Sequence, residues 1–250
     1  ALCPSRTPEL TNTGSYEKCW KRLDGHWNML KRESLGAIFS EIFISHLGEE
    51  LGFPMAKYQR YDSETIQSED FTGGGKYNLQ TARALMSEDY ESDFPYNCIV
   101  FQNISPKLLK QYLAILFLDA LCMNYDRHID NYGILTDPNS GKIVSMAPNF
   151  DNNLALLTND LTVWEPVSGF LSDYHDLFSK YPAPDVSPNQ LCLATTRAYR
   201  STAAEFSTDE CHALRSKEEI QKFIFQSYCI IHDQTLKPFP SMELDDEPEL

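Results

Sequence analysis

Apolar and polar positions alternate in short runs through the first third of the chain, a pattern typical of half-buried β-strands. The dipeptide Asp24–Gly25 separates the first two runs and predicts a tight hairpin turn. Between the second and third runs, apolar residues recur at helical spacing from Ser40 until Gly52. We therefore expect a small sheet with one helix. The four runs predicted as strands are residues 14–23, 26–33, 55–62 and 65–71.

After the glycine-rich stretch at 72–76, the periodicity becomes mainly helical. Residues 77–88 are predicted to be a helix. Ser105 and Pro106 form a helix start, followed by a segment that is apolar nearly all round after Tyr112 and is therefore predicted to be buried. The segment 132–148 predicts a second hairpin. Further helices are predicted at 189–204, 208–214 and 216–234.

Composition and charge narrow the class of protein. The chain has 250 residues and a net charge of −15, which disfavours direct binding to nucleic acid. Its 7 cysteines are scattered without a C-x-x-C pair, so we expect neither a disulfide framework nor a zinc site, and a cytoplasmic location. No apolar run reaches 18 residues, so we expect no membrane span and no membrane partner.

The stretch "NYDRHIDNYGIL", residues 124–135, places a cluster of polar side chains directly after the apolar helix. Asp126 and Asn131 lie within it, and Asp151 follows the predicted hairpin. A hairpin brings its two outer ends together, so these three side chains are expected to converge. Magnesium prefers such oxygen ligands. Taken alone, the stretch is better explained as a solvated turn. The buried helix before it, the hairpin after it and Asp151 at the far end of the hairpin together favour an active site.

Kinases use this arrangement of a catalytic aspartate, an asparagine five residues later and a further aspartate after a hairpin. They also need a strand lysine at the phosphates, for which Lys31 is the main candidate and Lys18, Lys21 and Arg32 are rivals. Glu41, in the first predicted helix, is placed to pair with Lys31. Each residue alone is also explained as an ordinary surface charge. Their order along the chain is what favours a kinase.

These motifs resemble the HipA-like bacterial serine/threonine kinases, in a compact form without the N-terminal domain that members of toxin–antitoxin pairs usually carry. The D-x-H-x-x-N loop of that family resembles the stretch from Asp126 to Asn131, and its later metal-binding acid resembles Asp151 in "APNFD". The resemblance implies that Asp126 and Lys31 are catalytic and that Asn131 and Asp151 bind the metal. The residues that it implies at the nucleotide are Gly14, Ser15, Lys31, Glu41, Glu69, Phe71 and His128.

The resemblance implies an α+β, two-lobed protein-kinase-like fold with a small β-rich N-lobe and a larger, mainly helical C-lobe. We expect the N-lobe at 1–72, the C-lobe at 73–238 and a disordered acidic tail at 239–250. The implied activity is transfer of the ATP γ-phosphate, with Mg²⁺, to a Ser or Thr of a protein, including autophosphorylation, with Ser15 as its candidate. An antitoxin-type protein is a candidate partner. The alternatives are a small-molecule or lipid-headgroup kinase and a catalytically silent nucleotide-binding module.

Overall fold

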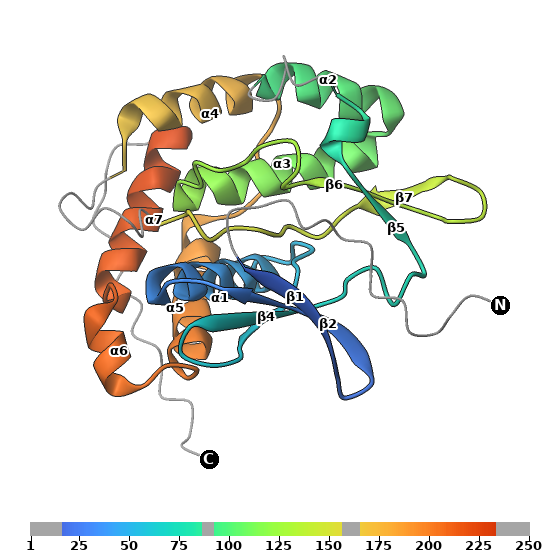
Figure 1. Ribbon diagram of the computed structural model, residues 1–250. Helices are drawn as coiled ribbons and strands as arrows, with labels where there is room; N and C mark the ends of the chain where they lie inside the picture. The colour runs from blue at the N-terminus through green and yellow to red at the C-terminus, as the bar shows by residue number, and fades with distance from the viewer. Residues whose placement is uncertain (1–16, 87–92, 157–165, 234–250) are drawn as a thin grey trace.

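Two antiparallel sheets and a group of helices make up the part of the chain that the computed structural model describes, residues 17–86, 93–156 and 166–233. Figure 1 shows the first sheet and helix α1 below a layer of helices, with the β6–β7 hairpin extending from that layer. The protein therefore has the predicted α+β organisation, with a small sheet part and a larger helical part. None of the helices in the described residues is long and apolar enough to cross a membrane.

The first sheet has the strand order β1-β2-β4-β3 and carries the first part of the site. The predicted turn is confirmed, because Asp24 and Gly25 both adopt positive φ angles, of 46° and 86°. These angles suit the sharp turn of a two-residue hairpin. The strands are β1 (Lys18–Leu23), β2 (His26–Arg32), β3 (Tyr58–Arg60) and β4 (Thr65–Glu69).

Helix α1 (Leu35–Glu50) begins earlier than the predicted start at Ser40. Ser34 is extended and its side chain accepts a hydrogen bond from the Ala37 backbone N–H, so it caps the helix before the apolar periodicity becomes clear. The helix is buried on most faces because it packs along α5 (Pro188–Ala203) as well as under the sheet. His46 Nδ1 lies 3.0 Å from Thr202 Oγ1 across this contact.

The second sheet corrects one prediction. Residues 77–88 do not form a helix: Asn78–Thr81 is strand β5, followed by a single 3-10 turn at Ala82–Ala84. Strand β5 pairs with β6 (Gly133–Thr136), which in turn pairs with β7 (Ile143–Met146), as the predicted hairpin required. A Cβ at Gly133 would lie 2.2 Å from the Gln80 carbonyl oxygen, so this pairing needs glycine there. Long-range pairing has overridden the local helical pattern.

The helices surround α3 (Pro106–Cys122), which the sequence predicts to be buried. Ser105 caps it and Pro106 occupies its first turn, as predicted. From Tyr112 to its end every residue is buried, because α3 packs against helices on several sides and against β7. The other helices are α2 (Phe94–Ile104), α4 (Ser168–Lys180), α6 (Thr208–Ala213) and α7 (Lys217–Ile231).

Candidate active site

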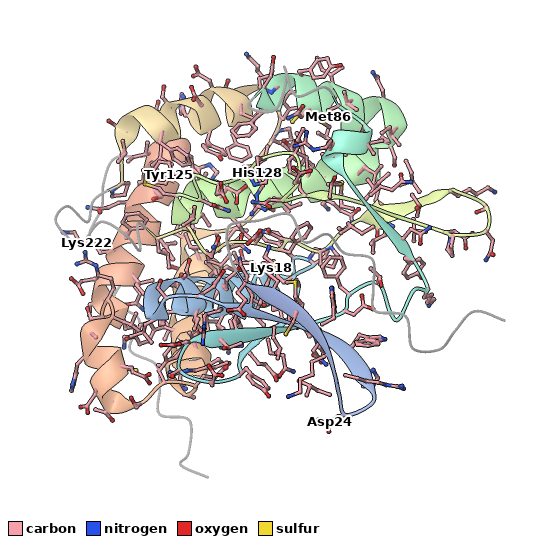
Figure 2. All side chains as sticks on the ribbon, viewed as in Figure 1. Lys18, Asp24, Met86, Tyr125, His128 and Lys222 are labelled. Atoms are coloured by element: carbon pink, nitrogen blue, oxygen red, sulfur yellow. The ribbon has the colours of Figure 1, made fainter. Side chains whose placement is uncertain are left out.

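The polar loop that follows α3 holds Asp126 in place with its own side chains. Met123 ends the helix in the left-handed conformation, with φ 51°. The Asn124 carboxamide then accepts a hydrogen bond from the Asp126 backbone N–H at 3.1 Å, and the Asn131 amide donates to the Asp126 carbonyl at 2.8 Å. The Asp126 side chain remains 39% exposed. A fixed backbone with an accessible carboxylate suits a residue that receives a proton from a bound substrate. Tyr125 and His128, labelled in Figure 2, mark the position of this loop.

Arg127 joins the polar loop to the segment that carries Asp151. Its buried guanidinium forms a two-pronged ion pair with Asp119 of α3, with both N–O distances at 2.8 Å. The same group donates to the backbone carbonyls of Asn131 at 2.6 Å and Phe150 at 2.8 Å. Arg127 is therefore a structural centre of the site, although the sequence alone shows only a charged residue within the stretch 124–135. Asp130, by contrast, pairs with the half-exposed Arg83 at the surface.

Asp151 is turned into the site by an unusual backbone conformation. Its φ is +61°, in the left-handed region that residues other than glycine rarely adopt. Asn149 pairs with the chain around Met55, and the Asp151 backbone N–H donates to the buried Tyr58 hydroxyl at 3.1 Å. The predicted hairpin thus returns the chain beside the first sheet, and strand β3 fixes the place where Asp151 turns.

Lys31 on β2 meets Asp151 across 120 residues of sequence, with Lys31 Nζ 2.7 Å from Asp151 Oδ1. Lys31 is buried, and it also contacts the carboxylates of Glu33 and, at 3.8 Å, Glu41. Burial alone would lower the Lys31 pKa, but the three acids outweigh it and raise that pKa above its ordinary value. The same pairing holds the Asp151 pKa below its ordinary value, although burial opposes it. Lys31 is therefore a cation held among three acids.

Of the other basic candidates, Lys21 and Arg32 are not drawn into this cluster. The Lys21 ammonium donates to Tyr61 on the exposed side of the sheet, and the exposed Arg32 pairs with surface glutamates. Lys18 stands opposite Lys31 in the β1–β2 register. The charge of Lys18 also lowers the Asp151 pKa, but among the predicted strand cations Lys31 is the one for which the structure gives a direct contact with Asp151.

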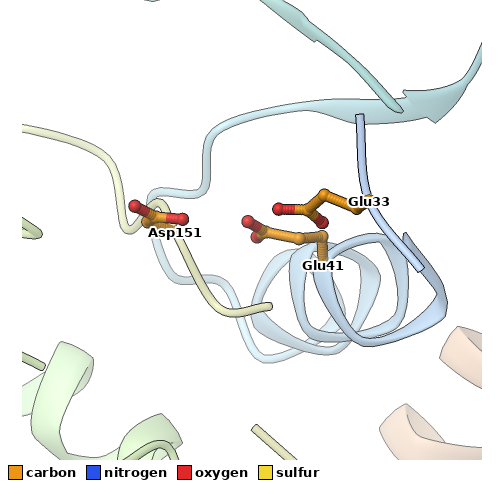
Figure 3. Close-up of side chains that lie close together, drawn as sticks. All are labelled: Glu33, Glu41 and Asp151. Atoms are coloured by element: carbon orange, nitrogen blue, oxygen red, sulfur yellow. The ribbon is translucent and has the colours of Figure 1, made fainter. Parts of the chain in front are cut away.

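Glu33 is a member of the cluster that the sequence reasoning missed. Figure 3 shows the carboxylates of Glu33, Glu41 and Asp151 facing a common space, and their oxygens lie within 4.8 Å of one another. The available signal was the spacing between Lys31 and Glu33, because residues two apart in an extended chain point to the same face. That signal is weak, because Glu33 lies just beyond the end of β2.

Glu41 lies at the cluster, as predicted, but its closest hydrogen bond is to the protein backbone. Its Oε2 accepts from the Asn152 backbone N–H at 2.8 Å. Burial raises the Glu41 pKa to about 8, and the neighbouring Lys31 only partly offsets this. Glu41 therefore helps to fix the turn that follows Asp151.

The predicted nucleotide-binding residues differ in how closely the structure places them to Asp126 and Asp151. The Phe71 ring stacks on the Phe150 ring, with centroids 5.6 Å apart, so Phe71 lies next to the Asp151 segment. Glu69 is exposed at the end of β4. His128 accepts a hydrogen bond from the Asp130 backbone N–H on Nδ1, and its Nε2 lies 4.0 Å from Asp126 Oδ2. Gly14 and Ser15 lie outside the described residues.

The donor set fits a magnesium ion. Asp151 supplies a carboxylate and Asn131 an amide oxygen, both of the oxygen type that a hard cation prefers. Glu33 Oε2 and Glu41 Oε1 are buried without a hydrogen-bond partner among the described residues, so the cluster has acceptor capacity left over. Excess buried acceptors of this kind suit a site that binds positive charge.

Comparisons with known proteins agree with this fold. No protein-family model and no curated protein sequence matches the chain. Its structure is similar to that of the Helicobacter pylori proinflammatory kinase CtkA, with a TM-score of 0.58 and 18% identity over 86% of this chain and 91% of that one. A second similar structure is HipA of a Shewanella oneidensis toxin–antitoxin complex with HipB and operator DNA, with a TM-score of 0.48 and 13% identity over 92% of this chain and 66% of that one. The likeness to CtkA shows that the chain has a kinase-like fold.

Proposed function

We propose that the protein is an ATP- and Mg²⁺-dependent serine/threonine protein kinase of HipA-like type, which also phosphorylates itself. The observation that carries this proposal is the contact between Lys31 Nζ and Asp151 Oδ1 beside the Asp126–Asn131 loop. A phosphoryl transferase needs a cation for the phosphates, ligands for the metal and an acceptor for the hydroxyl proton in one place. Lys31, the oxygens of Asn131 and Asp151, and the Asp126 carboxylate are our candidates for these three roles.

The residues would divide the reaction as follows. Asp126 orients the acceptor hydroxyl and takes its proton. Lys31 binds phosphate oxygens, while Asn131 and Asp151 would hold Mg²⁺, whose chemistry is to neutralise charge on the phosphates. Arg127 keeps the Asn131 and Phe150 carbonyls, and so both metal-binding segments, at a fixed separation. We assign adenine contact to Phe71 and the neighbouring backbone at Glu69, and phosphate contact to Gly14, Ser15 and His128.

The acceptor is proposed to be a Ser or Thr of a protein, and an antitoxin-type protein remains a predicted partner. A small-molecule kinase would use the same loop, so the acceptor has to be tested directly. Incubation of the protein with labelled ATP and Mg²⁺, alone and with mixed protein substrates, should label protein serine or threonine. Label that enters only small molecules would contradict the protein-kinase proposal.

The decisive test separates binding from transfer. Calorimetry should show Mg²⁺-dependent ATP binding by the wild type, and Asp126→Asn should keep that binding while losing transfer by about 10²–10⁴-fold, the usual contribution of a general base. Asp130→Asn is the matched control from the same loop, and we expect it to keep most of the activity. Absence of Mg²⁺-dependent ATP binding in the wild type would overturn the proposal, and undiminished transfer by Asp126→Asn would overturn the role of Asp126.

A further inference from the structure

The three acids around Lys31 are not equivalent, and their contacts differ in kind. Glu33 makes the shortest contact with the Lys31 ammonium, and its side chain is completely buried. Asp151 contacts the same nitrogen at 2.7 Å, with 22% of its side chain exposed. Glu41 stands further off, at 3.8 Å, and its second oxygen is occupied by the Asn152 backbone N–H. Glu41, on helix α1, is therefore the furthest of the three acids from the Lys31 ammonium.

We infer that Glu33 is the residue that positions Lys31 for phosphate binding, and that Glu41 instead positions the Asp151 turn. This inference rests on the proposed function. If Asp151 is a metal ligand, its carboxylate is shared with the metal in the working enzyme and is a weaker partner for Lys31. Glu33 is then the close carboxylate that still holds the ammonium in place.

Glu33 is itself held from two sides, which a positioning residue requires. Its backbone N–H donates to the Glu64 carbonyl at 2.8 Å, and its Oε1 accepts from the Asn153 amide at 3.1 Å. Asn153 comes two residues after Asp151. The Glu33 carboxylate thus connects the strand that carries Lys31 to the segment that carries the proposed metal ligand.

Without the Glu33 charge, Lys31 keeps Asp151 as its nearest carboxylate. The ammonium would then compete with Mg²⁺ for Asp151, because both cations need the same oxygens. Glu33→Gln should therefore weaken Mg²⁺-dependent ATP binding by about tenfold or more, the scale on which groups that support a ligand residue act. Glu33→Asp retains the charge and should recover part of this loss.

Loss of a negative charge alone would also weaken cation binding, so the comparison with Glu41→Gln is informative. At a pH above about 8, where Glu41 is ionised as well, that variant removes the same charge from the same cluster but leaves the close Lys31–Glu33 contact. We expect it to raise the Kd of ATP with Mg²⁺ less than Glu33→Gln does. Glu64→Gln is the control that should leave the Kd unchanged. The Glu64 side chain is exposed, and Glu33 is hydrogen-bonded to its backbone carbonyl, which the substitution does not alter.

The closing experiment is a double-mutant cycle with Lys31→Met, read by ATP binding at fixed Mg²⁺ and, separately, by denaturant unfolding. In the Lys31→Met background, Glu33→Gln should produce little further change in Kd. If the role of Glu33 is purely structural, Glu33→Gln should weaken ATP binding equally in the wild type and in Lys31→Met, while the two substitutions remain coupled in their effect on the free energy of unfolding. That result would overturn the inference. A wild type that binds no ATP would overturn the proposed function as well, whereas normal binding by Glu33→Gln would overturn the inference alone.

Discussion

At the scale of single residues, Arg127 shows how much of the site depends on one buried side chain. Its guanidinium reaches Asp119, two backbone carbonyls and the side-chain oxygens of Asn149 and Asn152. A planar guanidinium presents five donors in a fixed fork, which lysine cannot reproduce. The local sequence shows only a charge in a loop, and the partners that define its role come from distant segments.

We predict that Arg127→Met lowers the free energy of unfolding by about 3–5 kcal/mol, because it leaves the Asp119 carboxylate buried without its partner. Denaturant unfolding followed by circular dichroism measures the loss. Arg83→Met is the matched control, because the Arg83–Asp130 pair is half exposed and such pairs contribute about 0–1 kcal/mol. Equal losses in the two variants would contradict the central role of Arg127.

Glu41 makes stability depend on pH. Burial raises its folded-state pKa to about 8 from the ordinary 4.5, with Lys31, Glu33, Asp151 and Tyr58 as its ionisable neighbours. The folded protein therefore keeps a proton that the unfolded chain releases between these values. The contribution of protonated Glu41 to the free energy of unfolding is fully present below about pH 4.5, and it is lost as the pH rises towards about 8.

Glu41→Gln has no proton to release at this position. We therefore predict that its free energy of unfolding falls less than that of the wild type between about pH 5 and about pH 8. Denaturant titrations at several pH values measure the two slopes. Glu64→Gln, at a surface acid, should follow the wild type. Parallel pH profiles for Glu41→Gln and the wild type would show that Glu41 is already ionised in the folded protein.

At the scale of elements, Arg60 connects strand β3 to the region around α6. Its guanidinium forms a two-pronged pair with Glu210, its backbone N–H donates to the Glu205 carboxylate at 2.7 Å, and its charge lies 4.7 Å from the centre of the Phe206 ring. The pairing with Arg60, together with hydrogen bonds from Ser207, lowers the Glu210 pKa to about 2. Strand β3 carries Tyr58, which supports Asp151, so this connection reaches the site.

We predict that Arg60→Met increases amide hydrogen exchange in β3 and α6 by removing the pair that joins them. The β6–β7 hairpin should not change, because it packs elsewhere. Amide exchange followed by mass spectrometry measures the effect. Arg215→Met is the control, because Arg215 pairs with Glu219, four residues later in α7. A change confined to α6 would mean that the pair does not stabilise β3.

Elements set by local signals were predicted well. The Asp24–Gly25 hairpin and the Ser105 cap depend on backbone preferences that neighbouring residues encode. Strand β5 was predicted wrongly as a helix, because its conformation follows from pairing with β6 more than fifty residues away. Helix α2 was not predicted, although Asp93 caps it and Pro95 lies in its first turn.

The site followed the same division. The return of the segment before Asp151 to the Asp126–Asn131 loop, where Arg127 donates to the Asn131 and Phe150 carbonyls, was predictable because a hairpin fixes where its ends meet. The choice of Lys31 over its rivals was uncertain in sequence and follows from the sheet that turns its side chain inwards. Glu33 was missed because its partner Asn153 is 120 residues away. The kinase roles of these residues remain predictions until the variants above are measured.

At the scale of the whole molecule, the net charge of −15 sets the long-range field. We predict that peptides with Lys or Arg around the acceptor serine are phosphorylated with a higher kcat/KM than acidic ones, because the field attracts them. The preference should shrink as salt is raised, since salt screens exposed charges. Steady-state rates for a matched basic and acidic peptide at low and high salt measure this. A preference that is unaffected by salt would point to local contacts in place of the overall field.

The packing of α1 along α5 has a consequence for how the protein unfolds. In the sequence, helix α1 lies between strands β2 and β3 of the sheet part. Its residue Phe39 nevertheless packs against Tyr199 and Phe206 of the helical part. Loss of either part would expose this apolar surface to water, so neither has a complete core alone. The two parts should therefore melt together in one cooperative transition, and a fragment cut between them should fail to refold.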